Sequence, residues 1–107
     1  MKNIGELMKK AQQVQSQITI LQSKMEKQEF TGEAANGAVR IILTGKGEGV
    51  RVHLDPSVVD PKDIETLEDL ILVAINDAKT KAEDTQMAEM EKIQASLGLP
   101  PGFKMPF

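Results

Sequence analysis

The sequence predicts an α+β chain with a long N-terminal helix, a three-stranded antiparallel meander and a long C-terminal helix. Three observations lead to this expectation. An apolar stripe at helical spacing runs through residues 3–29, alternating apolar residues fill 30–55, and a second helical stripe begins near residue 60. The 107 residues fit a single domain, residues 1–107, with an apolar tail at 99–107.

The first helix is expected over residues 3–29, where only Gly5 argues against a helix. Apolar residues recur there in steps of three and four, as at the a and d positions of a heptad repeat. The stripe consists of Ile4, Leu7, Ala11, Val14, Ile18, Leu21 and Met25. Two interpretations remain open: the stripe packs on the chain's own sheet, or it is shared between that sheet and a partner helix.

Residues 37–44 and 48–54 alternate between apolar and polar side chains, which is typical of strands with one covered face. Gly45-Lys46-Gly47 between them predicts a hairpin turn, because glycine tolerates positive φ. A shorter strand at residues 29–33, followed by a turn at 35–37, completes the meander. The third strand is expected to place Val50, Val52 and Leu54 on its apolar face, and Arg51 and His53 on the other.

The last helix is expected to open at Asp60 and Pro61, since aspartate is a good N-cap and proline suits a first turn. A broad apolar face follows from Ile64 and thins after Ala82, so we expect the part beyond Ala82 to project into solvent. Gly98 predicts the end of this helix at about Leu97.

Element lengths favour a homodimer. A helix of about 26 residues spans about 39 Å, whereas a strand of about eight residues spans about 26 Å. Both helices are therefore expected to overrun the sheet on which they pack. Apolar overhangs left in water cost about 25 cal/mol per Å², and packing two copies together removes that cost.

No combination of residues in the sequence suits catalysis, so we do not expect an enzyme. The single histidine, His53, stands beside Arg51 in a strand pattern, without a nucleophile pattern near it. The glycines at 45, 47 and 49 lie between two strands, whereas a phosphate loop leads from a strand into a helix. No cysteine is present, and no His, Asp or Glu cluster has metal-ligand spacing. We expect no cofactor, metal or small-molecule substrate.

The location is predicted from two absences. No stretch approaches the roughly 18 apolar residues of a membrane span, and residues 1–10 lack the apolar run of a signal peptide. A cytoplasmic protein without membrane contact is the expectation.

Charge is distributed unevenly along a chain of net charge −3. Residues 1–29 carry five lysines against three glutamates, whereas residues 57–107 carry five lysines against ten acids. A row of lysines on the first helix, doubled in a dimer, could contact a phosphate backbone. These lysines are Lys9, Lys10, Lys24 and Lys27. Ordinary solubilising lysines are the alternative, and charge considered by itself favours it.

Six short segments of the sequence form a recognisable series. They are LMKKAQQ at 7–13, TGE at 31–33, DPS at 55–57, LEDL at 67–70, NDA at 76–78 and LPPGFKMPF at 99–107. In this order, over nearly the whole chain, they resemble the YbaB/EbfC family of bacterial nucleoid-associated proteins.

This resemblance implies tweezer-like homodimers whose protruding helices bind double-stranded DNA in the nucleoid and influence its organisation and gene expression. It implies no enzymatic activity and no cofactor. Carried over to this chain, the DNA contacts fall on Lys9 and Lys10, and further on Lys24, Lys27, Lys79 and Lys81. The alternative is a dimeric adaptor that binds another cytosolic protein through its dimer surface and its apolar tail, which otherwise docks on the dimer body.

Overall fold

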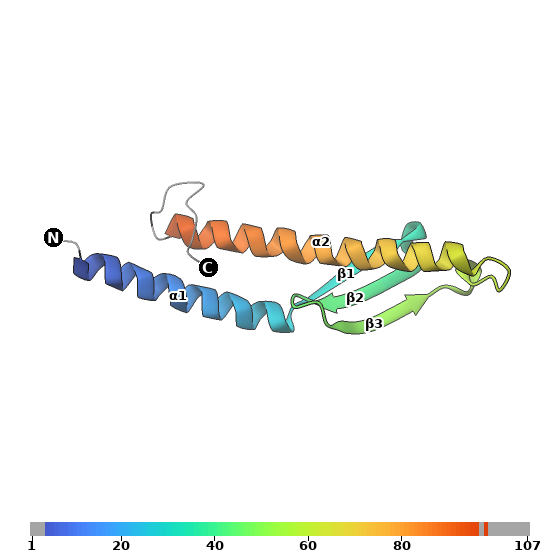
Figure 1. Cartoon of the computed structure of the whole chain (residues 1–107), viewed down its shortest axis with the longest axis horizontal. Coiled ribbons are helices and arrows are strands. Elements are labelled where there is room, and N and C mark those ends of the chain that lie inside the picture. Colours follow the sequence, from blue (N-terminus) through green and yellow to red (C-terminus); the bar gives the residue numbers. More distant parts are fainter. Residues whose placement is uncertain (1–3, 97, 99–107) are drawn as a thin grey trace.

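The computed structural model describes residues 4–96 and 98, and it confirms the α+β architecture. The elements are α1 (Ile4–Lys27), β1 (Glu29–Ala34), β2 (Val39–Thr44), β3 (Gly49–Leu54) and α2 (Ile64–Ser96). The strands form one antiparallel sheet in the order β1-β2-β3. The molecule measures 71 × 23 × 17 Å, and α2 runs beside the sheet at one end and beside α1 at the other (Figure 1). The apolar tail at 99–107, with the predictions made for it, lies outside the described residues.

Both predicted turns are present. Between β1 and β2, three successive residues, Ala35, Asn36 and Gly37, have left-handed backbones with φ of 54°, 56° and 88°. Gly47, in the turn between β2 and β3, has a φ of 89°. Asparagine and glycine adopt this region more readily than other residues, which explains why the chain reverses at these two positions.

The main core lies where α2 crosses β1 and β2. Ala74 and Ala78 of α2 are fully buried against Val39, Ile41 and Leu43 of β2. The helix approaches β1 closely because Gly32 has no side chain: a Cβ there would lie 1.9 Å from the backbone oxygen of Ala74. Small residues on both surfaces therefore set the distance between helix and sheet.

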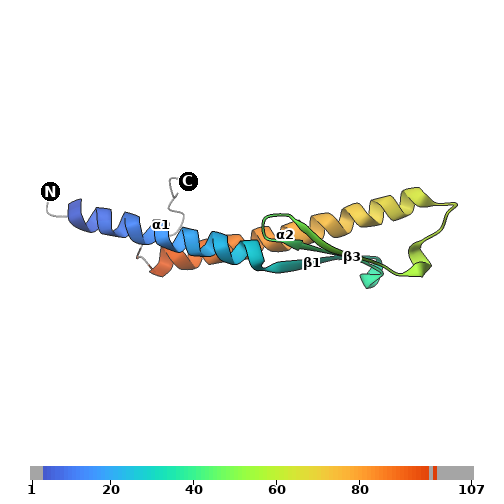
Figure 2. The ribbon, with the colours of Figure 1, turned by 90° about the horizontal axis from the view of Figure 1, so that it is seen from below.

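α1 does not lie on the sheet, whereas both interpretations of its stripe placed at least part of it there. It extends beyond the end of the sheet and packs along the C-terminal part of α2 (Figures 1 and 2). Only Gln28 separates α1 from β1, so the chain has no length in which to fold the helix back. The backbone N–H of Gly45 also ties this junction by donating to the carbonyl oxygens of Met25 and Gln28. We call α1 together with residues 82–96 of α2 the arm.

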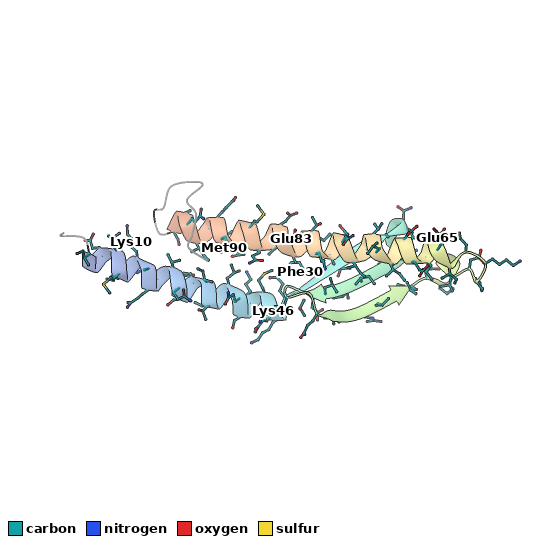
Figure 3. The ribbon with its side chains drawn as sticks, in the orientation of Figure 1. Lys10, Phe30, Lys46, Glu65, Glu83 and Met90 are labelled. Carbon is teal, nitrogen blue, oxygen red and sulfur yellow. The ribbon has the colours of Figure 1, made fainter. Side chains whose placement is uncertain are left out.

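The arm has its own apolar cluster, so the region beyond Ala82 does not simply project into solvent as expected. Leu21 and Met25 pack with Phe30, Ala82 and Ile93, and Phe30 marks the junction with the sheet in Figure 3. Burial follows only half of the predicted stripe. Ile18, Leu21 and Met25 are buried and Val14 is half-buried, whereas Ile4, Leu7 and Ala11 are exposed.

The expected start of α2 at Asp60 is wrong. The helix begins at Ile64, and the Asp63 carboxylate accepts hydrogen bonds from the backbone N–H and the hydroxyl of Thr66. Asp60 instead accepts the backbone N–H of Lys62 and closes a turn. Both aspartates have a side chain that can cap a helix. Asp63 is the N-cap because its carboxylate accepts the N–H of the residue three positions later, Thr66, as an N-cap does.

The apolar face of the third strand, β3, is not covered as predicted. Val52 pairs with Ile41, so it lies on the α2 side of the sheet as expected, but α2 covers only β1 and β2. Val50 is 48% exposed and Val52 59%. The apolar face of β3 is therefore left uncovered in a single chain.

Candidate nucleic-acid interface

Lys9 and Lys10 lie on the outer half of α1, near the far end of the arm (Figure 3, Lys10). Both are exposed, and neither forms an ion pair with another described residue. Lys9 borders an open polar groove of about 550 Å³ whose other lining residues are Gln12, Gln13, Ser16, Gln17 and Ser96. This end of the arm combines unpaired positive charge with neutral hydrogen-bonding side chains.

Lys24 forms an ion pair within the arm. Its Nζ lies 3.1 Å from Oε1 of Glu89 on α2, and Lys92 approaches the same oxygen at 3.7 Å. The hydrogen bond from Lys24 is the main reason that the pKa of Glu89 lies below its ordinary value. A phosphate would have to compete with Glu89 for Lys24, so this lysine is the weaker candidate.

Lys27 remains available at the sheet end of α1. It is exposed and has no ion-pair partner within the described part of the chain. It follows Lys9 by 18 residues, which is about five helical turns, so both project from the same side of the helix. That side faces away from the buried stripe.

The two lysines proposed on α2 differ in role. The Lys81 ammonium donates to the backbone oxygen of Thr31 at 2.8 Å and lies 3.3 Å from the Asp77 carboxylate, so it anchors α2 to β1. Lys79 has no ion pair to a described residue and borders a groove of about 210 Å³ at the β2–β3 turn. Lys46, which Figure 3 labels in that turn, pairs instead with Glu26 of α1.

Charge divides the arm into two surfaces. α1 carries four lysines against two glutamates, whereas residues 82–96 carry one lysine against four acids. An approaching polyanion is attracted to the α1 side and repelled from the α2 side.

Basic residues also occur on the outer face of the sheet, the face turned away from α2. A groove of about 230 Å³ there is lined by Arg40, Ile42, Arg51 and His53. Sequence alternation predicts that both Arg40 and Arg51 add positive charge to this outer face, although the lysines are the candidate DNA contacts. The strand register then places Arg40 opposite His53.

Other site classes find no support among residues 4–96 and 98. No group of three or more His, Asp or Glu side chains there could hold a metal ion. No helix of that region has the length and hydropathy needed to cross a membrane.

A family model described as the YbaB/EbfC DNA-binding family matches residues 1–97. The chain belongs to the YbaB/EbfC DNA-binding family. This membership confirms the resemblance found in the sequence.

Curated relatives of this YbaB/EbfC chain match it from end to end. A nucleoid-associated protein of Paramagnetospirillum magneticum is 53% identical over 107 residues, covering all of both chains. One of Rhodospirillum centenum is 52% identical over the same length, again with full coverage of both. An uncharacterized protein of Helicobacter pylori has the same fold: its crystal structure aligns with a TM-score of 0.70 at 20% identity, covering 84% of this chain and 95% of that one.

Proposed function

We propose that this chain is a nucleoid-associated protein that binds double-stranded DNA as a homodimer and thereby influences nucleoid organisation and gene expression. Its place of action is the bacterial cytoplasm, at the nucleoid. The match of the DNA-binding family to residues 1–97 carries the proposal. The names of the full-length relatives from Paramagnetospirillum magneticum and Rhodospirillum centenum support it.

The DNA contacts are assigned to the unpaired lysines of α1: Lys9, Lys10 and Lys27. They are exposed, they lie on the more basic helix of the arm, and no carboxylate among the described residues neutralises them through an ion pair. Lysine ammonium groups bind phosphates as point charges and do not read base edges. Lys24 and Lys81 are excluded from this set because Glu89 and the β1 edge already hold them.

Lysine–phosphate contacts need neither a cofactor nor a catalytic group. This agrees with the expectation that the protein is not an enzyme. It also makes the affinity depend on counterions released from the duplex. The function is one of binding.

The homodimer interface is assigned to the uncovered apolar surface formed by β3 and the adjacent flank of α2. Val52 pairs with Ile41 and so lies on the α2 side of the sheet, yet it is 59% exposed, and the nearby Val50 is 48% exposed. Asp77 and Lys81 contact β1, and at about 100° per residue Leu72 projects from the side of α2 that is turned away from β1. Leu72 is 57% exposed. A second copy would bury these residues and remove the cost of hydrating them.

Dimerisation would also raise the affinity for DNA above that of a single arm. The three lysines assigned as contacts in each arm, within a chain of net charge −3, make few phosphate contacts. Two arms on one dimer double that number, and binding of the second arm becomes intramolecular. The tweezer shape that the family resemblance implies is a geometry in which both arms reach one duplex.

Fluorescence anisotropy of a labelled DNA duplex, measured at several salt concentrations, tests the proposal. Six lysine–phosphate contacts per dimer predict a slope of about −5 in a plot of log K against log salt. A protein that leaves the duplex unbound even at low salt does not have this function. Light scattering on the same sample measures the oligomeric state independently.

A further inference from the structure

Two arginines lie on neighbouring strands of the outer sheet face with no acid between them. The register places Arg40 opposite His53 and Ile42 opposite Arg51, so Arg40 and Arg51 are diagonal neighbours. Such diagonal positions lie about 7–8 Å apart, within reach of long side chains. With Ile42 as its floor, this surface forms the groove of about 230 Å³ that we call the sheet groove.

The positive charges of the sheet groove are poorly compensated. Arg51 forms no ion pair with any residue that the structure describes. The carboxylate nearest to Arg40 belongs to Glu33 on β1, with 3.9 Å between Nε and Oε1 and both side chains about half exposed. Like charges directly opposite one another destabilise a sheet, and the two guanidinium groups, as diagonal neighbours, repel each other less strongly. A bound anion would relieve this repulsion. Residues that destabilise the fold locally, as these two arginines do, are expected at functional sites.

The groups that line the sheet groove suit a phosphate. Guanidinium presents paired N–H donors whose spacing matches two oxygens of a phosphate, and the His53 imidazole can add a further donor. No carboxylate is among the four lining residues. No Phe, Tyr or Trp is among the four lining residues, and two guanidinium groups suit a phosphate, so we take the phosphate as the recognised group.

We propose that the sheet groove binds backbone phosphates of DNA, as a second contact surface separate from the arm. The inference rests on the proposed DNA-binding function and adds a site to it. The outer sheet face stays open in the assigned dimer, because the dimer interface uses the opposite face of β3. Each dimer then has two sheet grooves in addition to its two arms.

The first test addresses the groove without DNA. Inorganic pyrophosphate is titrated into the full-length protein while the Nε–Hε NMR signals of Arg40 and Arg51 are followed. Both signals are expected to shift together and saturate, and Arg40→Gln should abolish the shift at Arg51. Glu33→Gln should strengthen binding, because it removes the carboxylate that lies 3.9 Å from Arg40. Signals that stay unmoved by pyrophosphate overturn the inference, whatever the protein does with DNA.

The second test asks whether DNA is the source of the phosphate. Arg51→Gln and Lys62→Gln each remove one exposed positive charge whose side chain has no partner among the described residues, which makes them a matched pair. Arg51→Gln should weaken duplex binding about five-fold, and lower the salt slope by about one for each groove, or about two per dimer. Lys62→Gln should change the affinity less than two-fold.

The outcomes separate the two proposals. If the wild-type protein binds duplex DNA and the two variants behave alike, the proposed function stands and the sheet groove is not a DNA site. If pyrophosphate binds but Arg51→Gln leaves DNA affinity unchanged, the groove takes a free phosphate compound and the DNA assignment is overturned. If the wild-type protein binds no DNA, the proposed function fails together with this inference.

Discussion

The Asp77 carboxylate accepts a hydrogen bond of 2.9 Å from the backbone N–H of Glu33. β1 pairs only with β2, so this N–H lies on the outer edge of the sheet and has no strand partner. Lys81 completes the arrangement by donating to the backbone oxygen of Thr31 on the same edge. One turn of α2 thus satisfies a donor and an acceptor of an edge strand, which would otherwise be open to pairing with another chain.

This contact predicts a loss of stability in acid. The N–H of Glu33, followed by Lys81, lowers the pKa of Asp77 in the folded protein. A lowered folded-state pKa stabilises the fold above the ordinary aspartate pKa of about 3.9 and loses that contribution as pH falls further. The thermal midpoint should therefore drop as the pH falls below about 4. Asp77→Asn should flatten this part of the curve. Asp84→Asn is the control, because the Asp84 carboxylate has no hydrogen bond in the described chain, and it should leave the curve unchanged. Equal curves for the two variants would contradict this role of Asp77.

Gly32 should tolerate no side chain. Its added Cβ would lie 1.9 Å from the oxygen of Ala74 and 2.5 Å from the backbone nitrogen of Ala78, and neither backbone atom can swing aside. We expect Gly32→Ala to lower the free energy of unfolding by about 3 kcal/mol, measured by urea denaturation. Gly5→Ala is the control, since nothing lies within 4 Å of its Cβ. A Gly32→Ala variant as stable as Gly5→Ala would place α2 farther from β1 than the structure has it.

The two halves of the α1 stripe should respond differently to truncation. Leu21 is 5% exposed within the arm cluster, whereas Leu7 is 64% exposed. Leu21→Ala should cost about 2–5 kcal/mol of unfolding free energy, and Leu7→Ala less than about 0.5 kcal/mol. Chemical denaturation of both variants measures this difference. A comparable cost at Leu7 would mean that another surface, such as a partner helix, covers the outer half of α1.

The sequence predicted the elements of this fold better than their arrangement. The heptad spacing of Leu21 and Met25 and the alternation from Val39 to Leu43 follow from local periodicity, and both survive in the structure. The direction of α1 depends on the connection to β1, which is the single residue Gln28. The periodicity of the helix and of the strand carries no information about this connection.

The lysine candidates show a second limit of sequence reasoning. Lys24 and Lys9 occupy similar positions in a helical pattern. Only the structure shows that Lys24 donates a hydrogen bond to Glu89, which lies 65 positions later in the sequence. Lys81 is likewise held by Thr31 of β1. Which charges are already neutralised depends on tertiary contacts, so the division of six lysines into internal and available ones needed the structure.

A charge on the uncovered face of β3 should disrupt the proposed dimer. Val52 is 59% exposed in one chain and lies in the assigned interface, whereas Ile20 is 61% exposed on α1. Val52→Asp should convert the protein to a monomer of 11.7 kDa in light scattering, because a buried carboxylate without a partner is costly. Ile20→Asp should remain a dimer of twice that mass. A Val52→Asp protein that stays dimeric would place the interface elsewhere.

Salt-dependent DNA binding of a Lys9→Ala, Lys10→Ala variant tests the assignment of α1 most directly. Anisotropy of a labelled duplex would be compared with the wild type and with Lys46→Ala, Lys62→Ala, which removes the same charge away from the assigned contacts. Losing four lysine–phosphate contacts per dimer should weaken binding strongly and reduce the steepness of the salt slope by about three to four. The control variant should keep the wild-type slope. A Lys9→Ala, Lys10→Ala protein with the wild-type slope and affinity would show that the arm lysines do not bind DNA.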